Sequence, residues 1–247
     1  MLPDALDLTQ NRLLAALPPE DRDRLCRRLE PVDLLPRQVL VAAGAAFEHI
    51  HFPVSGVASL LAAADETVLE IGLIGREGMV GLPVLFGTAA SPNMSVAVQI
   101  PGMALRMSAE ALRTELDRNA AFRALLLRYA EALLCQIAQS AICNRLHGVE
   151  QRLARWLLMA QDRAEADLLP LTQEYISLML GVRRPGVTVA AGNLAKAGLI
   201  RGAYGRIVIL DRKGLEASAC GCYGVVRRHF ERLLAEHRLT PPDRAGR

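Results

Sequence analysis

The sequence predicts an α+β protein with a β-rich N-terminal half, one long central helix and a helical C-terminal part. Short apolar runs separated by glycines fill residues 32–107, a periodic apolar pattern follows residue 119, and helical patterns dominate after residue 150. The chain has 247 residues, of which 51% are hydrophobic and 22% are charged. This length allows one large domain or two ordinary ones, each with its own core.

Composition also bounds the location of the protein. The longest apolar runs, such as Val39–Phe47, are shorter than the roughly 18 residues that a membrane-spanning helix needs. The first ten residues carry two aspartates and lack the basic-then-apolar pattern of a secretory signal. The cysteines are odd in number and scattered, which is typical of a reducing compartment; they are Cys26, Cys135, Cys143, Cys220 and Cys222. We therefore expect a cytoplasmic protein with no membrane partner.

Charge is distributed unevenly along the chain. The net charge is only +3, but residues 1–149 contain 13 arginines and 16 acidic residues, a net of −3. Residues 150–247 carry 16 basic and 10 acidic residues, a net of +6. A basic C-terminal part is expected where one domain meets a polyanion, although chance clustering would produce the same count.

The N-terminal residues 1–118 are predicted to form a β-roll behind a short helix. A helix start is indicated by Pro19 with Glu20 and Asp21 behind it, and Leu25 and Leu29 form its apolar stripe. Short strands are then expected in the apolar segments QVLVAAG, HIHFPVSGVASLLAA, TVLEIGLIG, GMVGLPVLFG and SVAVQIPGMALRM. Strands at this spacing favour a compact roll of two sheets, similar to a jelly roll.

A long helix is predicted over residues 119–147, after a shorter helix capped by Ser108. Six residues recur at alternating intervals of three and four, the spacing of a coiled-coil seam; they are the apolar Leu127, Ala130, Leu134, Ile137 and Ala141, and the polar Asn144. A second apolar face carries Leu126, Tyr129 and Leu133. One face is expected to cover the β-roll and the other to meet the same helix of a second subunit. A helix buried on both sides within one chain is the alternative.

Residues 148–247 are predicted to form a DNA-binding domain. Thr172 is suited to cap a helix over Gln173–Leu180, and Gly181 suits a tight turn with a positive φ. A second helix then begins near Arg184 and Pro185, because proline is favoured in the first helical turn. A helix, a short glycine turn and a second helix form a helix-turn-helix, whose second helix enters the major groove of DNA.

A β-hairpin wing is expected after this motif. Apolar strands at residues 199–201 and 207–210 flank a glycine-containing turn. The predicted DNA-binding residues are polar or basic side chains of the two helices and the wing, namely Thr172, Gln173, Arg183, Arg184, Thr188, Arg201 and Arg206. An arginine-rich helix pair with an adjoining hairpin and no DNA partner is the alternative.

Taken together, residues 11–215 resemble the Crp/Fnr family of bacterial transcription regulators. The segments that carry the resemblance are LTQEYISLMLGVRRPGVTVAAGNLAKAGLI and HFPVSGVASL with IGLIGREGMVGLPVLFG. The resemblance implies a cyclic-nucleotide-binding-like β-roll, a dimerisation helix and a winged helix-turn-helix. It also implies a homodimer that reads a two-fold operator in double-stranded DNA, with RNA polymerase and an unknown small-molecule effector as further candidate partners.

The sequence departs from the family pattern at the effector site. Members that bind cyclic AMP have a glutamate and an arginine where this chain is expected to place Leu82 and Met94, next to Gly81 and Ser95. These four residues are the predicted ligand pocket. Since a buried phosphate loses its strongest partner without the arginine, we expect that cyclic AMP is not the effector. The second helix also lacks the Glu and the second Arg that many members carry, which leaves Arg183, Arg184 and Thr188 to read bases.

No cofactor, metal site or catalytic residue is predicted. The Cys220-x-Cys222 pair has no second pair at ligand spacing, so ordinary thiols are expected and a redox role stays open. His49 and His51 share one strand face, where packed or surface histidines are more common than ligands. No nucleophile–base set or phosphate loop indicates an enzyme. The alternative function is a β-roll regulatory protein that binds a small ligand and controls a protein partner.

Overall fold

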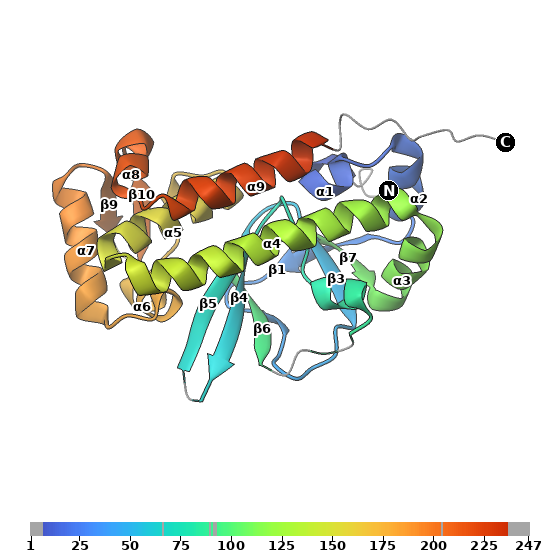
Figure 1. Cartoon of the computed structure of the whole chain (residues 1–247), viewed down its shortest axis with the longest axis horizontal. Coiled ribbons are helices and arrows are strands. Elements are labelled where there is room, and N and C mark those ends of the chain that lie inside the picture. The colour runs from blue at the N-terminus through green and yellow to red at the C-terminus, as the bar shows by residue number, and fades with distance from the viewer. Residues whose placement is uncertain (1–6, 66, 89, 91–92, 204, 237–247) are drawn as a thin grey trace.

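The computed structural model describes residues 7–236 except 66, 89, 91–92 and 204. As predicted, it is an α+β structure in which a β-roll, one long helix and a helix-turn-helix follow one another (Figure 1). None of the described helices is both long enough and apolar enough to cross a membrane.

The N-terminal part is a β-roll preceded by short helices. The helices are η1 (Leu8–Gln10), α1 (Arg12–Ala15) and α2 (Pro19–Cys26). One antiparallel sheet has the order β1-β7-β3, formed by Glu30–Leu34, Gly102–Ser108 and His49–Pro53. The other has the order β2-β6-β4-β5, formed by Val39–Val41, Met94–Ile100, Val57–Ala64 and Thr67–Ile74. Ile50, Phe52 and Leu73 are fully buried in the core of the roll.

One of the predicted strands is wrong. The segment GMVGLPVLFG forms the 3₁₀ helix η2 (Leu82–Phe86), and only Val80 makes an isolated bridge, to His51. Gly81 precedes η2 with φ +109°, and an added Cβ would lie 2.4 Å from Ile50 Cδ1. Pro83 has no N–H to donate to a strand ladder and suits the first turn of a helix.

Two helices follow the roll. Ser108 caps α3 (Ala109–Arg118), as predicted, and its hydroxyl accepts from Ala111 N at 3.1 Å. The side chain of Asn119 then caps α4 (Ala120–Leu146) by accepting from Phe122 N at 2.9 Å. The helix α4 runs along the roll (Figure 1), and its Tyr129 hydroxyl donates to Met79 O at 3.0 Å.

The predicted seam of α4 lies only partly on the surface. Leu127 and Leu134 are 47% and 61% exposed, and Ala141 and Asn144 are exposed too. In contrast, Ala130 is buried and Ile137 is half-buried within the chain, because a straight helix of 3.6 residues per turn rotates away from a strict seven-residue repeat. The other predicted face, with Leu126, Tyr129 and Leu133, is buried as expected.

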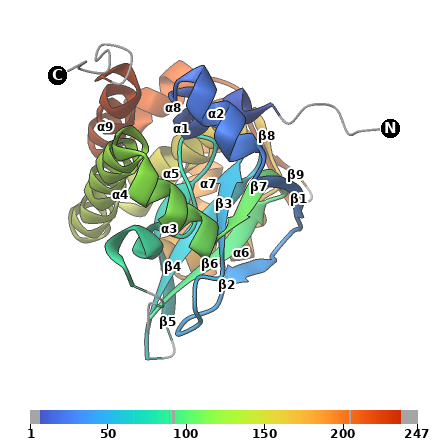
Figure 2. The same cartoon turned by 90° about the vertical axis from the view of Figure 1, so that its right-hand side faces the viewer.

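The C-terminal part is mainly helical. Its helices are α5 (Val149–Ala164), α6 (Gln173–Leu180), α7 (Arg184–Lys196), α8 (Arg212–Ser218) and α9 (Cys222–Glu236). Its small sheet has the order β8-β10-β9, formed by Leu168–Leu169, Arg206–Ile209 and Ile200–Ala203. Helices α8 and α9 were not predicted from the sequence. Helix α9 lies beside α4 in both views (Figures 1 and 2), with the ring of Phe230 6.4 Å from that of Tyr129.

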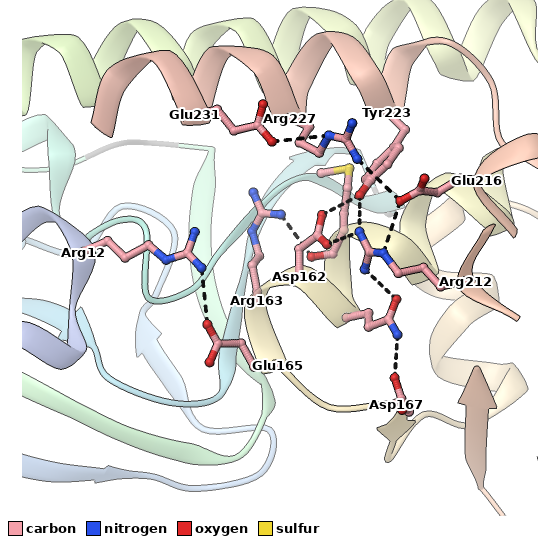
Figure 3. A network of polar contacts seen from close by, with 12 residues as sticks. Arg12, Asp162, Arg163, Glu165, Asp167, Arg212, Glu216, Tyr223, Arg227 and Glu231 are labelled. Carbon is pink, nitrogen blue, oxygen red and sulfur yellow. Dashed lines mark hydrogen bonds and ion pairs between the residues drawn. The ribbon is translucent and has the colours of Figure 1, made fainter. Parts of the chain in front are cut away.

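A polar network fastens α8 and α9 to α5 (Figure 3). Arg212 donates to Asp162 Oδ1 at 2.7 Å, to Gln161 Oε1 at 2.8 Å and to the Tyr223 hydroxyl at 2.6 Å. The Tyr223 hydroxyl in turn donates to Asp162 Oδ2 at 2.9 Å. The network adjoins a cavity of about 730 Å³ in which the guanidinium of Arg163 is paired with Glu77 at 2.8 Å. The network therefore holds α8 and the start of α9 against α5.

Candidate nucleic-acid interface

Helices α6 and α7 form the predicted helix-turn-helix. The Thr172 hydroxyl caps α6 by accepting from Tyr175 N at 3.1 Å, as predicted. Gly181 ends α6 with φ +61°, the conformation that made glycine the expected residue there. Arg183 is the N-cap of α7, and Pro185 lies in its first turn. Val187 and Leu194 are buried, which turns the start of α7 outward.

A groove of about 670 Å³ lies between these helices and the wing. Five of the predicted residues line it, namely Thr172, Gln173, Arg184, Thr188 and Arg206. Helix N-termini, two guanidinium groups and amide or hydroxyl donors are the groups that proteins use against phosphates and base edges. The carboxylate of Glu174 also lines the groove and reduces its positive charge.

Hydrogen bonds inside the groove show which polar side chains are bonded within the protein and which keep donors for a partner. Thr188 Oγ1 lies 2.9 Å from Gln173 Oε1 and 3.1 Å from Arg184 O, and its single proton is shared between these two acceptors. The hydroxyl proton of Thr188 is therefore used within the protein, and this residue orients Gln173. The amide Nε2 of Gln173 keeps its two donors for a partner, because its oxygen accepts from Thr188.

The wing consists of β9 and β10, as predicted. Arg206 is exposed and lines the groove, whereas Arg201 pairs with Val208 across the hairpin and is exposed outside the groove. The predicted turn residue Tyr204 lies outside the described residues. Strand β8, which sequence reasoning missed, pairs with β10 and supports the wing.

Arg183 lies apart from the other predicted residues. It lines a second cavity of about 790 Å³, which α6 shares with the roll residues Arg37 and Leu69. The turn of the motif is close to the roll here, since an added Cβ at Gly181 would lie 2.4 Å from Leu69 Cδ2. The helix-turn-helix is thus docked on strand β5 in this conformation.

A buried polar cluster joins the roll to the helices at the same place. Glu70 of β5 accepts from Ser59 Oγ of β4 and from Trp156 Nε1 of α5, each at 2.6 Å. The Tyr175 hydroxyl of α6 lies 3.5 Å from Ser59 Oγ. Burial raises the pKa of Glu70 to about 7 against the opposing effect of these hydrogen bonds and of Arg155, and burial likewise raises the pKa of Tyr175 to about 12.

The residues of the predicted ligand pocket lie on separate elements. Gly81 and Leu82 are at the start of η2, and Met94 and Ser95 are at the start of β6, where Ser95 pairs with Leu61. Their joint contact with a ligand stays a prediction. His51 is buried on β3, and burial lowers the pKa of its imidazole to about 4.

Sequence reasoning missed one group of side chains that the fold brings together. Cys143, His147, Cys220 and Cys222 place one ligand atom each within 4.8 Å of all the others. Cys143 lies on α4, and His147, four residues later, ends that helix. Cys220 precedes α9, and Cys222 is the first residue of α9. The Cys-x₃-His spacing was the available signal, but only the fold shows that the two pairs meet.

Comparisons with known proteins agree with this architecture. Residues 151–218 match the model of the Crp-like helix-turn-helix domain. The fold is similar to that of FixK2 from Bradyrhizobium japonicum, with a TM-score of 0.65 and 15% identity over 78% of this chain and 98% of that one. CLP from Xanthomonas campestris, a c-di-GMP-responsive global regulator, gives a TM-score of 0.60 and 17% identity over 77% and 98%. A CRP-family transcriptional regulator from Thermus thermophilus gives 0.60 and 17% over 76% and 96%. No curated protein matches the sequence.

These findings define the class of the protein. The chain has the fold of Crp/Fnr transcription regulators, and its C-terminal part contains a Crp-like helix-turn-helix domain. The matched helix-turn-helix domain, together with this fold, indicates a DNA-binding transcription regulator.

Proposed function

We propose that the protein is a cytoplasmic homodimer that binds a two-fold operator and is not an enzyme. The observation that carries the proposal is the groove of the helix-turn-helix, where Gln173, Arg184 and Arg206 turn donors outward between α7 and the wing. In this proposal residues 1–118 are the sensor, 119–147 the dimerisation helix and 148–247 the reader. RNA polymerase and a small-molecule effector are the further partners.

The exposed side of α4 supports a second copy as the partner. Leu127, Leu134, Ile142 and Leu146 are 46–70% exposed along one helix, and a run of exposed apolar side chains marks an interaction surface. A second α4 would cover them in an isologous contact, which a two-fold operator requires. Ala141 and Asn144 of the predicted seam adjoin this stripe, and Ala130 and Ile137 would contribute little to it.

Residues of the groove have distinct expected roles in DNA binding. Arg184 reads a base edge from the first turn of α7, and Gln173 donates its amide to a phosphate or base. Thr172 and Arg206 contact phosphates, with Arg201 beside them on the wing. Thr188 acts by holding Gln173. Arg183 reaches DNA only after the motif leaves the roll, because it now lines the cavity shared with β5.

A mobility-shift titration with Arg184→Ala tests this assignment. The variant should bind its operator about 1–3 kcal/mol more weakly and lose discrimination at one base position. Lys196→Ala is the matched control, since Lys196 is exposed at the far end of α7. Equal weakening on every duplex would make Arg184 a phosphate contact. Failure of the native protein to bind any duplex at low salt would favour the alternative, a roll that controls a protein partner.

Cyclic AMP is not the proposed effector. Leu82 and Met94 offer no charge to a cyclic phosphate, and a buried anion needs a cationic or hydrogen-bonding partner. Titration calorimetry with cyclic AMP should show no saturable heat. Saturable micromolar binding would contradict this part of the proposal.

A further inference from the structure

The four side chains Cys143, His147, Cys220 and Cys222 lie where three elements of the fold meet. Cys143 is in the last turns of α4, and His147 is the residue that ends it. Cys220 lies between α8 and α9, and Cys222 is the first residue of α9. The three cysteines are at most 5% exposed and form a small cluster separate from the main core.

The distances between the ligand atoms suit one tetrahedral ion. Cys143 Sγ lies 3.4 Å from Cys220 Sγ, and Cys222 Sγ lies 3.6 Å from His147 Nδ1. A tetrahedral zinc ion with Zn–S bonds of about 2.3 Å and a Zn–N bond of about 2.0–2.1 Å separates two sulfurs by about 3.8 Å and a sulfur from a nitrogen by about 3.6 Å. Small side-chain movements would therefore complete the geometry.

Buried positive charge beside the cluster supports thiolates at this place. Arg155 is 5% exposed, and its Nε and one terminal nitrogen have no hydrogen-bond partner among the described residues. Arg152 is also buried, and its Nε is likewise without a partner there. Both guanidinium groups interact electrostatically with Cys143. Neither guanidinium lies within salt-bridge distance of a described carboxylate, although Arg155 also favours the charged form of Glu70 from further away. A group carrying three thiolates would therefore add counter-charge beside two buried arginines.

We propose that Cys143, His147, Cys220 and Cys222 bind one Zn²⁺ ion in a closed Cys₃His site. Four protein ligands leave no position for substrate, which is the arrangement of structural zinc sites. The net charge of three thiolates and one Zn²⁺ is −1, which the adjacent arginines offset. The ion would join the end of α4 to the start of α9, next to the point where the DNA-binding part begins.

Metal analysis of the full chain tests the proposal. The protein is purified without a histidine tag under reducing conditions, and its zinc content is measured by inductively coupled plasma mass spectrometry. The native chain and the control Cys135→Ser, whose half-buried thiol lies outside the cluster, should each retain one zinc per chain. Cys222→Ser and His147→Gln should lose it. His147 is only half-buried, so its variant keeps the test valid if Cys222→Ser does not fold.

Cobalt gives a second readout that is independent of DNA binding. Co²⁺ replacing zinc in the native chain should show the intense visible absorption of tetrahedral thiolate coordination, and one equivalent of Zn²⁺ should abolish it. Zinc should also raise the Tm of the native chain and leave that of His147→Gln unchanged. The proposal is wrong if the reduced native chain takes up no stoichiometric zinc, if Cys222→Ser retains it, or if the isolated protein holds a Cys143–Cys220 disulfide and binds no zinc after reduction.

Discussion

The buried carboxyl of Glu70 makes a quantitative prediction about pH. Burial raises its pKa from 4.5 to about 7, even though Ser59 and Trp156 donate to it and Arg155 and Arg163 oppose the shift. The charged form is therefore the costly one in the folded protein. The stabilising contribution of the neutral Glu70 carboxyl is fully present below pH 4.5, declines above that pH, and is lost as the pH rises through about 7.

The magnitude follows from the size of the shift. A pKa that rises from 4.5 to about 7 corresponds, at about 1.4 kcal/mol per pH unit, to about 3 kcal/mol over the whole window, and about 2–3 kcal/mol of this falls between pH 5 and pH 8. Glu70→Gln removes the titration and keeps an oxygen to accept from Trp156 Nε1. Ser59 can then accept from the new amide and still donate to Gln99, which lies 3.0 Å away.

Urea unfolding of the native chain and Glu70→Gln at several pH values measures the effect. The unfolding free energy of the variant should rise by about 2–3 kcal/mol relative to that of the native chain between pH 5 and pH 8. Glu110→Gln, which neutralises an exposed carboxylate, is the control and should run parallel to the native chain. A difference between native and Glu70→Gln that does not change with pH would refute the reasoning.

Two further changes test the fold and the assembly. Asn11→Ala should lower the unfolding free energy by about 2–3 kcal/mol, because Asn11 is fully buried, donates to Pro53 O and Gly78 O at 2.9 Å each, and caps α1. Urea unfolding measures this loss, and a loss under about 0.5 kcal/mol would contradict the prediction. Leu134→Glu should convert the proposed dimer to a folded monomer in sedimentation experiments, since it adds charge to the exposed stripe of α4; an unchanged dimer would place the interface elsewhere.

Local signals account for the elements that could be predicted. Helix α3 and the helix-turn-helix could be predicted from capping and turn residues, because Ser108, Thr172 and Gly181 interact with backbone groups only a few residues away. The failure at Leu82–Phe86 has the same origin, since apolar residues next to glycine and proline suit a strand or a tight helix equally. Helix α9 carries no equally clear start signal, and its contacts with α4 are far apart in sequence.

The candidate sites likewise differ in whether they depend on local sequence or on contacts between distant segments. The groove could be predicted residue by residue because its members lie within one motif, whereas the separate position of Arg183 depends on how that motif docks on β5. The cysteine cluster could not be predicted, because Cys143 and Cys220 are 77 residues apart and meet only when α9 packs on α4. Burial of Glu70 against Trp156 is likewise a consequence of contact between two parts of the chain.

Selection of bound duplexes from a randomised DNA pool tests the central claim most directly. The proposed homodimer should enrich an inverted repeat whose half-sites are about 10–10.5 base pairs, or a multiple of this, apart from centre to centre, because each α7 enters one of two major grooves on the same side of the helix. Enrichment of a single asymmetric half-site, or of no sequence, would contradict the account.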